Sequence, residues 1–137
     1  AFEGDWTPTE RSQEGADFGW LTGCQELSLG RTEIRDIAPL AELTQLTDLE
    51  LEFCLIEDLT PLAGLTGLTS LSLWDNLITD LTPLAGLTQL TFLDLDGNQI
   101  SALTPLAGMT NLKALLAGDN LITDLSPLAG IVRLESR

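Results

Sequence analysis

Residues 68–89 read LTSLSLWDNLITDLTPLAGLTQ, and this stretch carries the pattern that decides the fold. Units of the same 22-residue length open at Cys24, Leu46, Leu90 and Leu112, with Cys24 the single departure from an opening leucine. Five consecutive units therefore cover residues 24–133. Repetition at such a period is typical of a solenoid, because each repeat forms one coil that stacks on its neighbours. Below, positions 1 to 22 are counted from the first residue of each unit.

Alternating apolar and polar residues at the start of each unit predict a short strand with one buried face. In the unit that opens at Leu68, Leu71 and Leu73 occupy the buried face and polar residues separate them. Later apolar positions complete an inward set that one coil cannot bury alone, so stacked coils must share one core. For this unit the predicted inward set is Leu68, Leu71, Leu73, Ile78, Leu81, Leu84 and Leu87.

Position 9 holds an asparagine in three units, at Asn76, Asn98 and Asn120. The chain must turn there, after the strand, so backbone N–H and C=O groups need partners. An inward asparagine side chain both donates and accepts, and we expect it to bond its own and the adjacent coil. Thr32 and Cys54 hold this position in the first two units, where we expect a weaker ladder.

A hydroxyl residue before proline marks the second half of the later units, for example Thr60-Pro61 and Thr82-Pro83. Proline suits the first position of a helix, and a preceding hydroxyl is able to cap it by accepting a free N–H. Glycine follows so soon that the sequence predicts a single 3₁₀ turn and no longer helix. Strands on one side and narrower turns on the other predict a curved stack with the strands on its concave side.

The motif LxxLxLxxNxIxxLxPLxxL, which runs through residues 24–133, resembles the leucine-rich repeat family in its 22-residue, bacterial internalin-like form. The resemblance implies an α/β solenoid, with a parallel sheet on the concave face and short 3₁₀ turns on the convex side. It also implies a recognition scaffold without enzymatic activity, placed outside a bacterial cell or on its surface. The resemblance does not identify a ligand, because family members share the repeat framework and differ on the concave face.

Both ends depart from the repeat. Residues 1–23 contain Phe2, Trp6, Phe18 and Trp20, and we expect an N-terminal cap or degenerate coil that shields the first unit. Residues 134–137 begin a sixth unit without a visible C-terminal cap. The fifth unit would leave apolar residues uncovered, so we expect further chain or another molecule to cover it.

Composition excludes several functions. Six Lys plus Arg against 21 Asp plus Glu give a formal net charge of -15, which repels nucleic acids and anionic membranes. The chain has no His, so Ser–His and Cys–His nucleophiles are absent from it. No apolar run reaches the roughly 20 residues of a membrane-spanning helix. Cys24 and Cys54 lie too far apart for a disulfide in this register, and both are expected to be buried free thiols.

Outward positions 3, 5, 7 and 8 of the units are the candidate binding surface. Acidic residues dominate these positions, three large aromatic residues accompany them, and no Lys or Arg occurs from Asp36 to Leu112. This pattern favours a groove that binds a basic protein or peptide, with Trp74 as the central anchor. The candidate partner-binding residues are Trp74, Phe92, Phe53, Glu50, Glu52, Asp75, Asp94 and Asp96.

Other interpretations of these residues are weaker. Asp94-Leu95-Asp96-Gly97-Asn98 resembles the start of a calcium loop but lacks the third oxygen ligand, so we expect no metal and no cofactor. Glu50 and Asp94 would be about 9–10 Å apart, near glycosidase spacing, but an open face does not raise the pKa of an acid as that chemistry requires. We therefore expect no enzyme. Head-to-tail assembly into a filament is an open alternative, and carbohydrate stacking on Trp74 is a weaker one.

Overall fold

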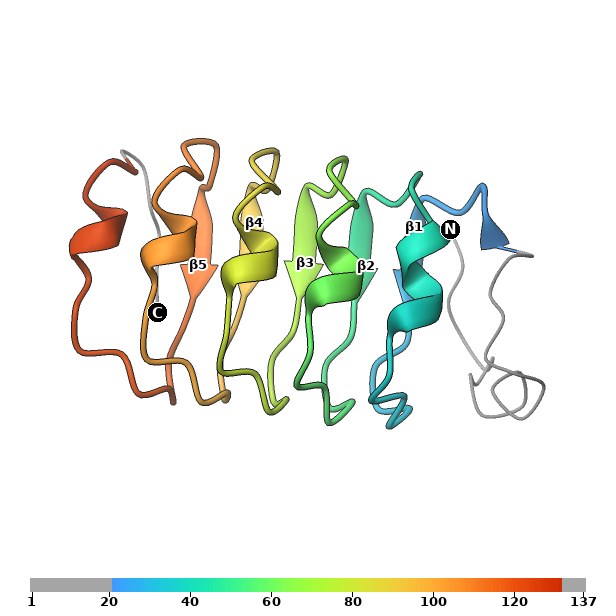
Figure 1. Cartoon of the computed structure of the whole chain (residues 1–137), viewed down its shortest axis with the longest axis horizontal. Coiled ribbons are helices and arrows are strands. Elements are labelled where there is room, and N and C mark those ends of the chain that lie inside the picture. The colour runs from blue at the N-terminus through green and yellow to red at the C-terminus, as the bar shows by residue number, and fades with distance from the viewer. Residues whose placement is uncertain (1–20, 132–137) are drawn as a thin grey trace.

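The computed structural model describes residues 21–131, in which a strand followed by a 3₁₀ turn occurs five times (Figure 1). The strands lie side by side in one parallel sheet, in the same order as in the sequence. They are β1 (Glu26–Ser28), β2 (Asp48–Glu50), β3 (Ser70–Ser72), β4 (Phe92–Asp94) and β5 (Ala114–Leu116). Leu49 aligns with Leu71, and Leu71 with Leu93, so one 22-residue period equals one step across the sheet. The predicted solenoid and its register are confirmed.

A 3₁₀ turn follows each strand, on the side of the coil opposite the sheet (Figure 1). Each turn begins one residue before a proline and is three to five residues long, so the predicted single 3₁₀ turn is confirmed. No longer helix occurs within residues 21–131. The turns are η2 (Ala38–Glu42), η3 (Thr60–Leu62), η4 (Thr82–Leu84), η5 (Thr104–Leu106) and η6 (Ser126–Leu128).

One apolar core runs through all five coils. Every member of the inward set predicted for residues 68–89 is at most 1% exposed. Position 14 shows that stacking produces this burial: Leu81 and Leu103 are each 1% exposed, whereas Leu125 is 65% exposed, because no described coil follows its own. Burial of each leucine side chain contributes about 1.5–3 kcal/mol, so the neighbouring coils are the source of stability.

The asparagine ladder forms as predicted. Asn98 Nδ2 donates to the carbonyls of Leu73 and Leu95, each at 3.0 Å, and its Oδ1 accepts the N–H of Ile78 at 3.0 Å. Asn76 makes the equivalent bonds, and it is 4% exposed. Each asparagine thus ties the turn of its own coil to the coil before it.

The predicted hydroxyl cap of the 3₁₀ turns is wrong. The turns have no side-chain bond from the residue at their cap position. The carboxylate two residues before the turn's first threonine accepts instead: Asp58 Oδ1 takes the Thr60 N–H at 2.9 Å and the Thr60 hydroxyl at 2.8 Å. Asp80 accepts from Thr82 in the same way. A carboxylate is the stronger acceptor, so the hydroxyl becomes a donor to it.

Both cysteines are free thiols, as predicted; Cys54 is buried, but Cys24 is half-buried, so the expected burial of Cys24 is wrong. Cys54 Sγ donates to the carbonyl of Leu29 at 3.2 Å and so replaces one bond of the missing asparagine. No helix within residues 21–131 is long and apolar enough to cross a membrane. The expected N-terminal cap with its four aromatic residues and the sixth unit at 134–137 fall outside the described part of the chain, except for residues 21–23.

Candidate functional site

The strand face consists of the outward side chains of β1 to β5 together with positions 7 and 8, which follow each strand. Parallel register arranges these side chains in rows that cross the coils. Neighbouring strands lie about 4.8 Å apart, so side chains in one row are close enough to contact one another. One row is Glu26, Asp48, Ser70, Phe92 and Ala114, and another is Ser28, Glu50, Ser72, Asp94 and Leu116.

Three side chains from successive coils stack at the end of the strands. The Arg31 guanidinium carbon lies 4.2 Å from the centroid of the Phe53 ring, which places the cation over the negative face of the ring. The rings of Phe53 and Trp74 meet edge to face, with centroids 4.5 Å apart and an angle of 68° between their planes. Both rings are half-buried. The structure therefore brings Phe53 and Trp74 together and adds Arg31, which the sequence did not assign to the site.

The backbone at position 8 explains how Phe53 reaches Trp74. Position 8 adopts the left-handed conformation in every unit, with φ of 65° at Arg31, 57° at Phe53 and 55° at Asp75, and Gly97 has φ of 71°. Glycine suits this conformation, whereas a bulky side chain costs about 1–2 kcal/mol there. Phe53 adopts this conformation despite its cost, and its ring lies against Trp74 of the next coil.

Phe92 does not join this cluster. It is half-buried on β4 and aligns with Ser70, which lies four residues before Trp74 along the third coil. Four strand residues span about 13 Å, so Phe92 lies toward the opposite end of the strands from Trp74. A partner that contacts both must extend along the strands.

Two acidic residues lean along the sheet toward a glycine of an adjacent coil. The Glu52 carboxylate lies so close to Gly30 that any side chain at position 30 would collide with it, and Asp75 covers Gly97 in the same manner. Glu52 Oε2 is buried without a hydrogen-bond partner among the described residues. Asp75 and Glu50 are exposed. Glu52 is thus a half-buried acid with one oxygen in need of a donor.

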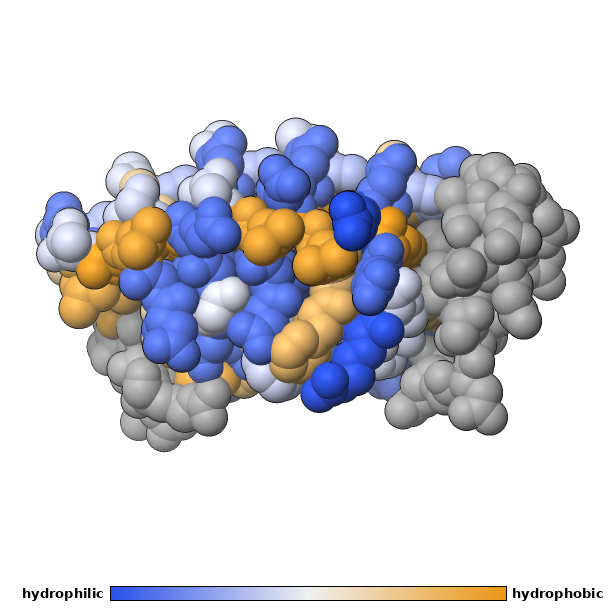
Figure 2. Space-filling view, turned by 90° about the horizontal axis from the view of Figure 1, so that it is seen from below, coloured by the Kyte–Doolittle hydropathy of each residue, from blue (hydrophilic) through white to orange (hydrophobic). Residues whose placement is uncertain are grey.

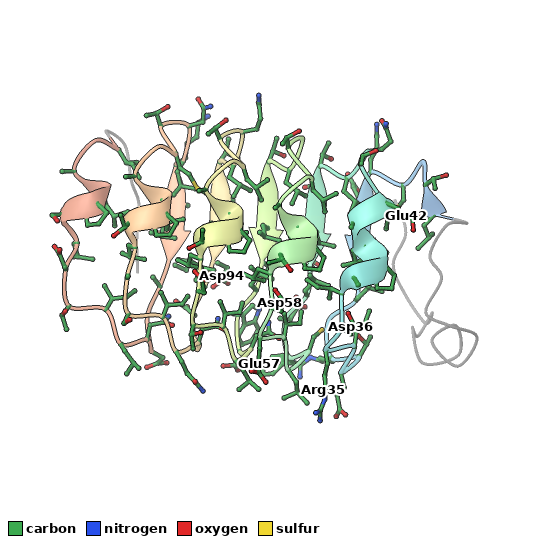
Figure 3. All side chains as sticks on the ribbon, in the orientation of Figure 1. Arg35, Asp36, Glu42, Glu57, Asp58 and Asp94 are labelled. Atoms are coloured by element: carbon green, nitrogen blue, oxygen red, sulfur yellow. The ribbon has the colours of Figure 1, made fainter. Side chains whose placement is uncertain are left out.

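Asp94 and Asp96 bond within the protein. Asp94 is only 8% exposed, and its Oδ1 accepts the N–H of Asp96 at 3.1 Å. Asp96 Oδ1 accepts the N–H of Gly118 at 2.6 Å, which ties the fourth coil to the fifth. Figure 3 shows Asp94 at the level of the strands, whereas Glu57 and Arg35 lie on the loops below them. These two aspartates therefore offer less of their carboxylates to a partner than Glu50 and Asp75 do.

Three carboxylates on the loops have lowered pKa values. Hydrogen bonds from Thr60 lower the pKa of Asp58, and bonds from Thr82 and Ser126 lower the pKa of Asp80 and Asp124. All three belong to the turn caps. Within residues 21–131, no group of three or more His, Cys, Asp or Glu residues is arranged to hold a metal ion. The groups that the described strand face presents are carboxylates and aromatic rings.

Comparison with known proteins supports a single family. The sequence profile of the family described as Leucine Rich repeats (2 copies) matches residues 66–108 and 89–130. The structure superposes on an internalin (inlF) from Listeria monocytogenes with a TM-score of 0.80 and 44% identity, covering 85% of this chain and 35% of that one. For an internalin C2 (inlC2) from the same species the TM-score is 0.73 and the identity 32%, with 88% of this chain and 65% of that one covered.

A third structure shares the fold alone. It is a plant peptide hormone receptor, RGFR1, solved in complex with RGF2, at 18% identity and a TM-score of 0.70, over 85% of this chain and 20% of that one. Comparison with curated proteins finds no match. The chain belongs to the leucine-rich repeat family, and its repeats are of the internalin-like type. It spans about a third of the first internalin and about two thirds of the second.

Proposed function

We propose that this chain is a recognition scaffold whose strand face binds a basic segment of a protein or peptide. The observation that carries the proposal is the Phe53–Trp74 pair, which is half-buried and lies beside acidic side chains. Aromatic residues with rigid surroundings are the usual anchors of protein interfaces. The plant receptor that shares this fold was solved with a bound peptide hormone, which supports the same use of the scaffold.

In this proposal the anchors and the charges have separate roles. Trp74 and Phe53 hold an apolar or cationic side chain of the partner, while Phe92 provides a second contact along the strands. Glu50 and Asp75 steer the partner, because exposed charges mainly raise the association rate. Glu52, which is half-buried, adds negative charge beside the aromatic anchors. Asp94 and Asp96 add to the negative field from their internally bonded positions.

The electrostatic field favours a cationic partner. No Lys or Arg occurs between Asp36 and Leu112, a stretch that contains the whole of the second, third and fourth units. Arg31 is the one cation placed on the described strand face, and it lies against Phe53 at the edge of this acidic stretch. Attraction of this kind acts over about 8–10 Å at physiological ionic strength, so it guides encounter.

A displayed library of random peptides tests the proposal without knowledge of the natural partner. Peptides selected on the wild-type chain should be rich in Lys and Arg. Trp74→Ala should weaken them mainly through faster dissociation, as the loss of a buried anchor does. Glu50→Gln with Glu52→Gln should slow association and reduce its salt dependence. Thr66→Ala, an exposed change among the turns, is the matched control.

Two results would contradict the proposal. If the selected peptides carried no net positive charge, the proposal that the partner is basic would be wrong. Basic peptides that bind Trp74→Ala and the double glutamine variant as tightly as the wild type would place the binding site away from the strand face.

A further inference from the structure

A row of side chains that includes three leucines lies on the loops that follow the strands, beside the strand face and outside the site described above. We call Leu55, Leu77, Gln99 and Leu121, which all occupy position 10, the edge stripe. Leu77 is 36% exposed and Leu55 is half-buried, whereas Leu121 is 63% exposed in the fifth coil, which no described coil follows. Figure 2 looks at these loops from below and shows hydrophobic patches that follow one another along the molecule, among hydrophilic ones.

Hydrogen bonds between coils fix the spacing of the edge stripe. The N–H of Leu77 donates to the carbonyl of Ile56 at 2.9 Å, and that of Leu121 donates to Ile100 at 2.8 Å. Gln99 makes the equivalent bond to Ile78 at 2.9 Å. Position 10 therefore advances by one coil at each step, about 4.8 Å. The stripe is a regular line of side chains and not a chance gathering.

Acidic side chains border the edge stripe. Glu57 and Asp58 follow Leu55 closely in the second unit, and Asp80 follows Leu77 in the third; all three are exposed. Leu55 also has φ of 60°, a conformation that costs a non-glycine residue about 1–2 kcal/mol. Partly exposed leucines followed by carboxylates have the charge pattern that complements a basic amphipathic segment.

We infer that a basic amphipathic helix of the partner lies along the edge stripe, with its apolar side on the leucines and its cations on the acids. This rests on the proposed function, because the helix would belong to the same basic partner. The spacing favours a helix over a strand. Three residues of a helix advance about 4.5 Å, close to one coil, and seven advance about 10.5 Å, close to two coils. Residues on the same side of an extended chain are about 6.6 Å apart, which does not match the spacing of about 4.8 Å between coils.

The probe is a synthetic peptide of leucine and lysine, with leucines at i, i+3, i+7 and i+10 of a helix. A second peptide of the same composition, with its leucines spread around the helix, is the control ligand. Fluorescence anisotropy at physiological ionic strength should show the patterned peptide binding at least about tenfold more tightly than the control peptide, as expected for buried leucine contacts. Leu55→Ser with Leu77→Ser should abolish this difference, while Gln99→Ser should leave it within about twofold.

Unfolding in urea shows whether the double variant keeps its fold. If it does not, Leu77→Lys serves in its place, because Leu77 is exposed enough to carry a charge that repels the probe. Equal binding of the two peptides, or patterned binding that the leucine changes leave intact, would overturn the inference. Loss of patterned binding in Trp74→Ala alone would also overturn it, yet would leave the strand-face proposal standing. Failure of the library selection, with stripe-dependent binding of the probe, would remove the strand-face proposal.

Discussion

Asn98→Ala removes the side chain that joins the third and fourth coils behind the strands. Asn98 is 7% exposed, so water cannot replace its bonds readily. The change leaves the N–H of Ile78 and the carbonyls of Leu73 and Leu95 without this partner. A buried donor without a partner costs about 1–3 kcal/mol, and the two carbonyls add less each because they have a second lone pair. We expect a loss of about 3–5 kcal/mol in the free energy of unfolding.

Asn111→Ala is the matched control for this prediction. Asn111 is exposed, and its Nδ2 donates to the carbonyl of Thr88 at 2.9 Å, so water can replace this bond when the side chain is removed. Its cost should stay below about 1 kcal/mol. Urea unfolding followed by circular dichroism measures both variants, and an unchanged slope shows that both unfold over the same surface. Equal losses in the two variants, or a loss below about 1 kcal/mol for Asn98→Ala, would refute the argument for the ladder.

Three further changes test the core, the ladder and the turn caps. Leu71→Ala should cost about 2–5 kcal/mol, because Leu71 is fully buried between Leu49 and Leu93, whereas Ser72→Ala should cost no more than about 0.5 kcal/mol; similar urea midpoints would contradict the strand register. Cys54→Asn should stabilise the protein by about 1 kcal/mol. The Oδ1 of the new side chain would accept the N–H groups of Thr32 and Ile34, as Asn76 accepts those of Cys54 and Ile56. No rise in the urea midpoint would show that the first coil cannot use the ladder. Asp58, Asp80 and Asp124 have a folded pKa below 3.8, so their contribution to the free energy of unfolding is present above pH 3.8 and is lost as pH falls through the folded pKa. Replacing all three by Asn should flatten the dependence of stability on pH in that window. An unchanged pH profile would exclude these caps as its source.

The repeat made the fold and much of the site predictable. Side chains alternate along a strand, so the period of 22 places Leu71 inward and Ser72 outward without any structure. The same register puts position 8 of one coil beside position 7 of the next. That is why Phe53 and Trp74 were expected on one surface and why their rings meet.

The direction of individual side chains was beyond the sequence pattern. Asp96 turns to Gly118 and Glu52 toward Gly30 because the absence of a side chain on the adjacent coil leaves room, which depends on packing between units. The stacking of Arg31 depends on the left-handed backbone at position 8. One missed signal was visible: Asp precedes Thr-Pro or Ser-Pro by two residues in several units, and this spacing is typical of a carboxylate that accepts the turn's N–H.

Amide chemical-shift mapping with a peptide selected from the library tests the central claim most directly, because it reports where the ligand binds. We expect the largest chemical-shift changes on β2 and β3 and on the residues after them, including Trp74 and its indole N–H. The mapped surface should shrink when Glu50 and Glu52 are replaced by Gln. Shifts confined to the 3₁₀ turns η3 (Thr60–Leu62) and η4 (Thr82–Leu84), on the opposite side of the coils, would contradict recognition by the strand face.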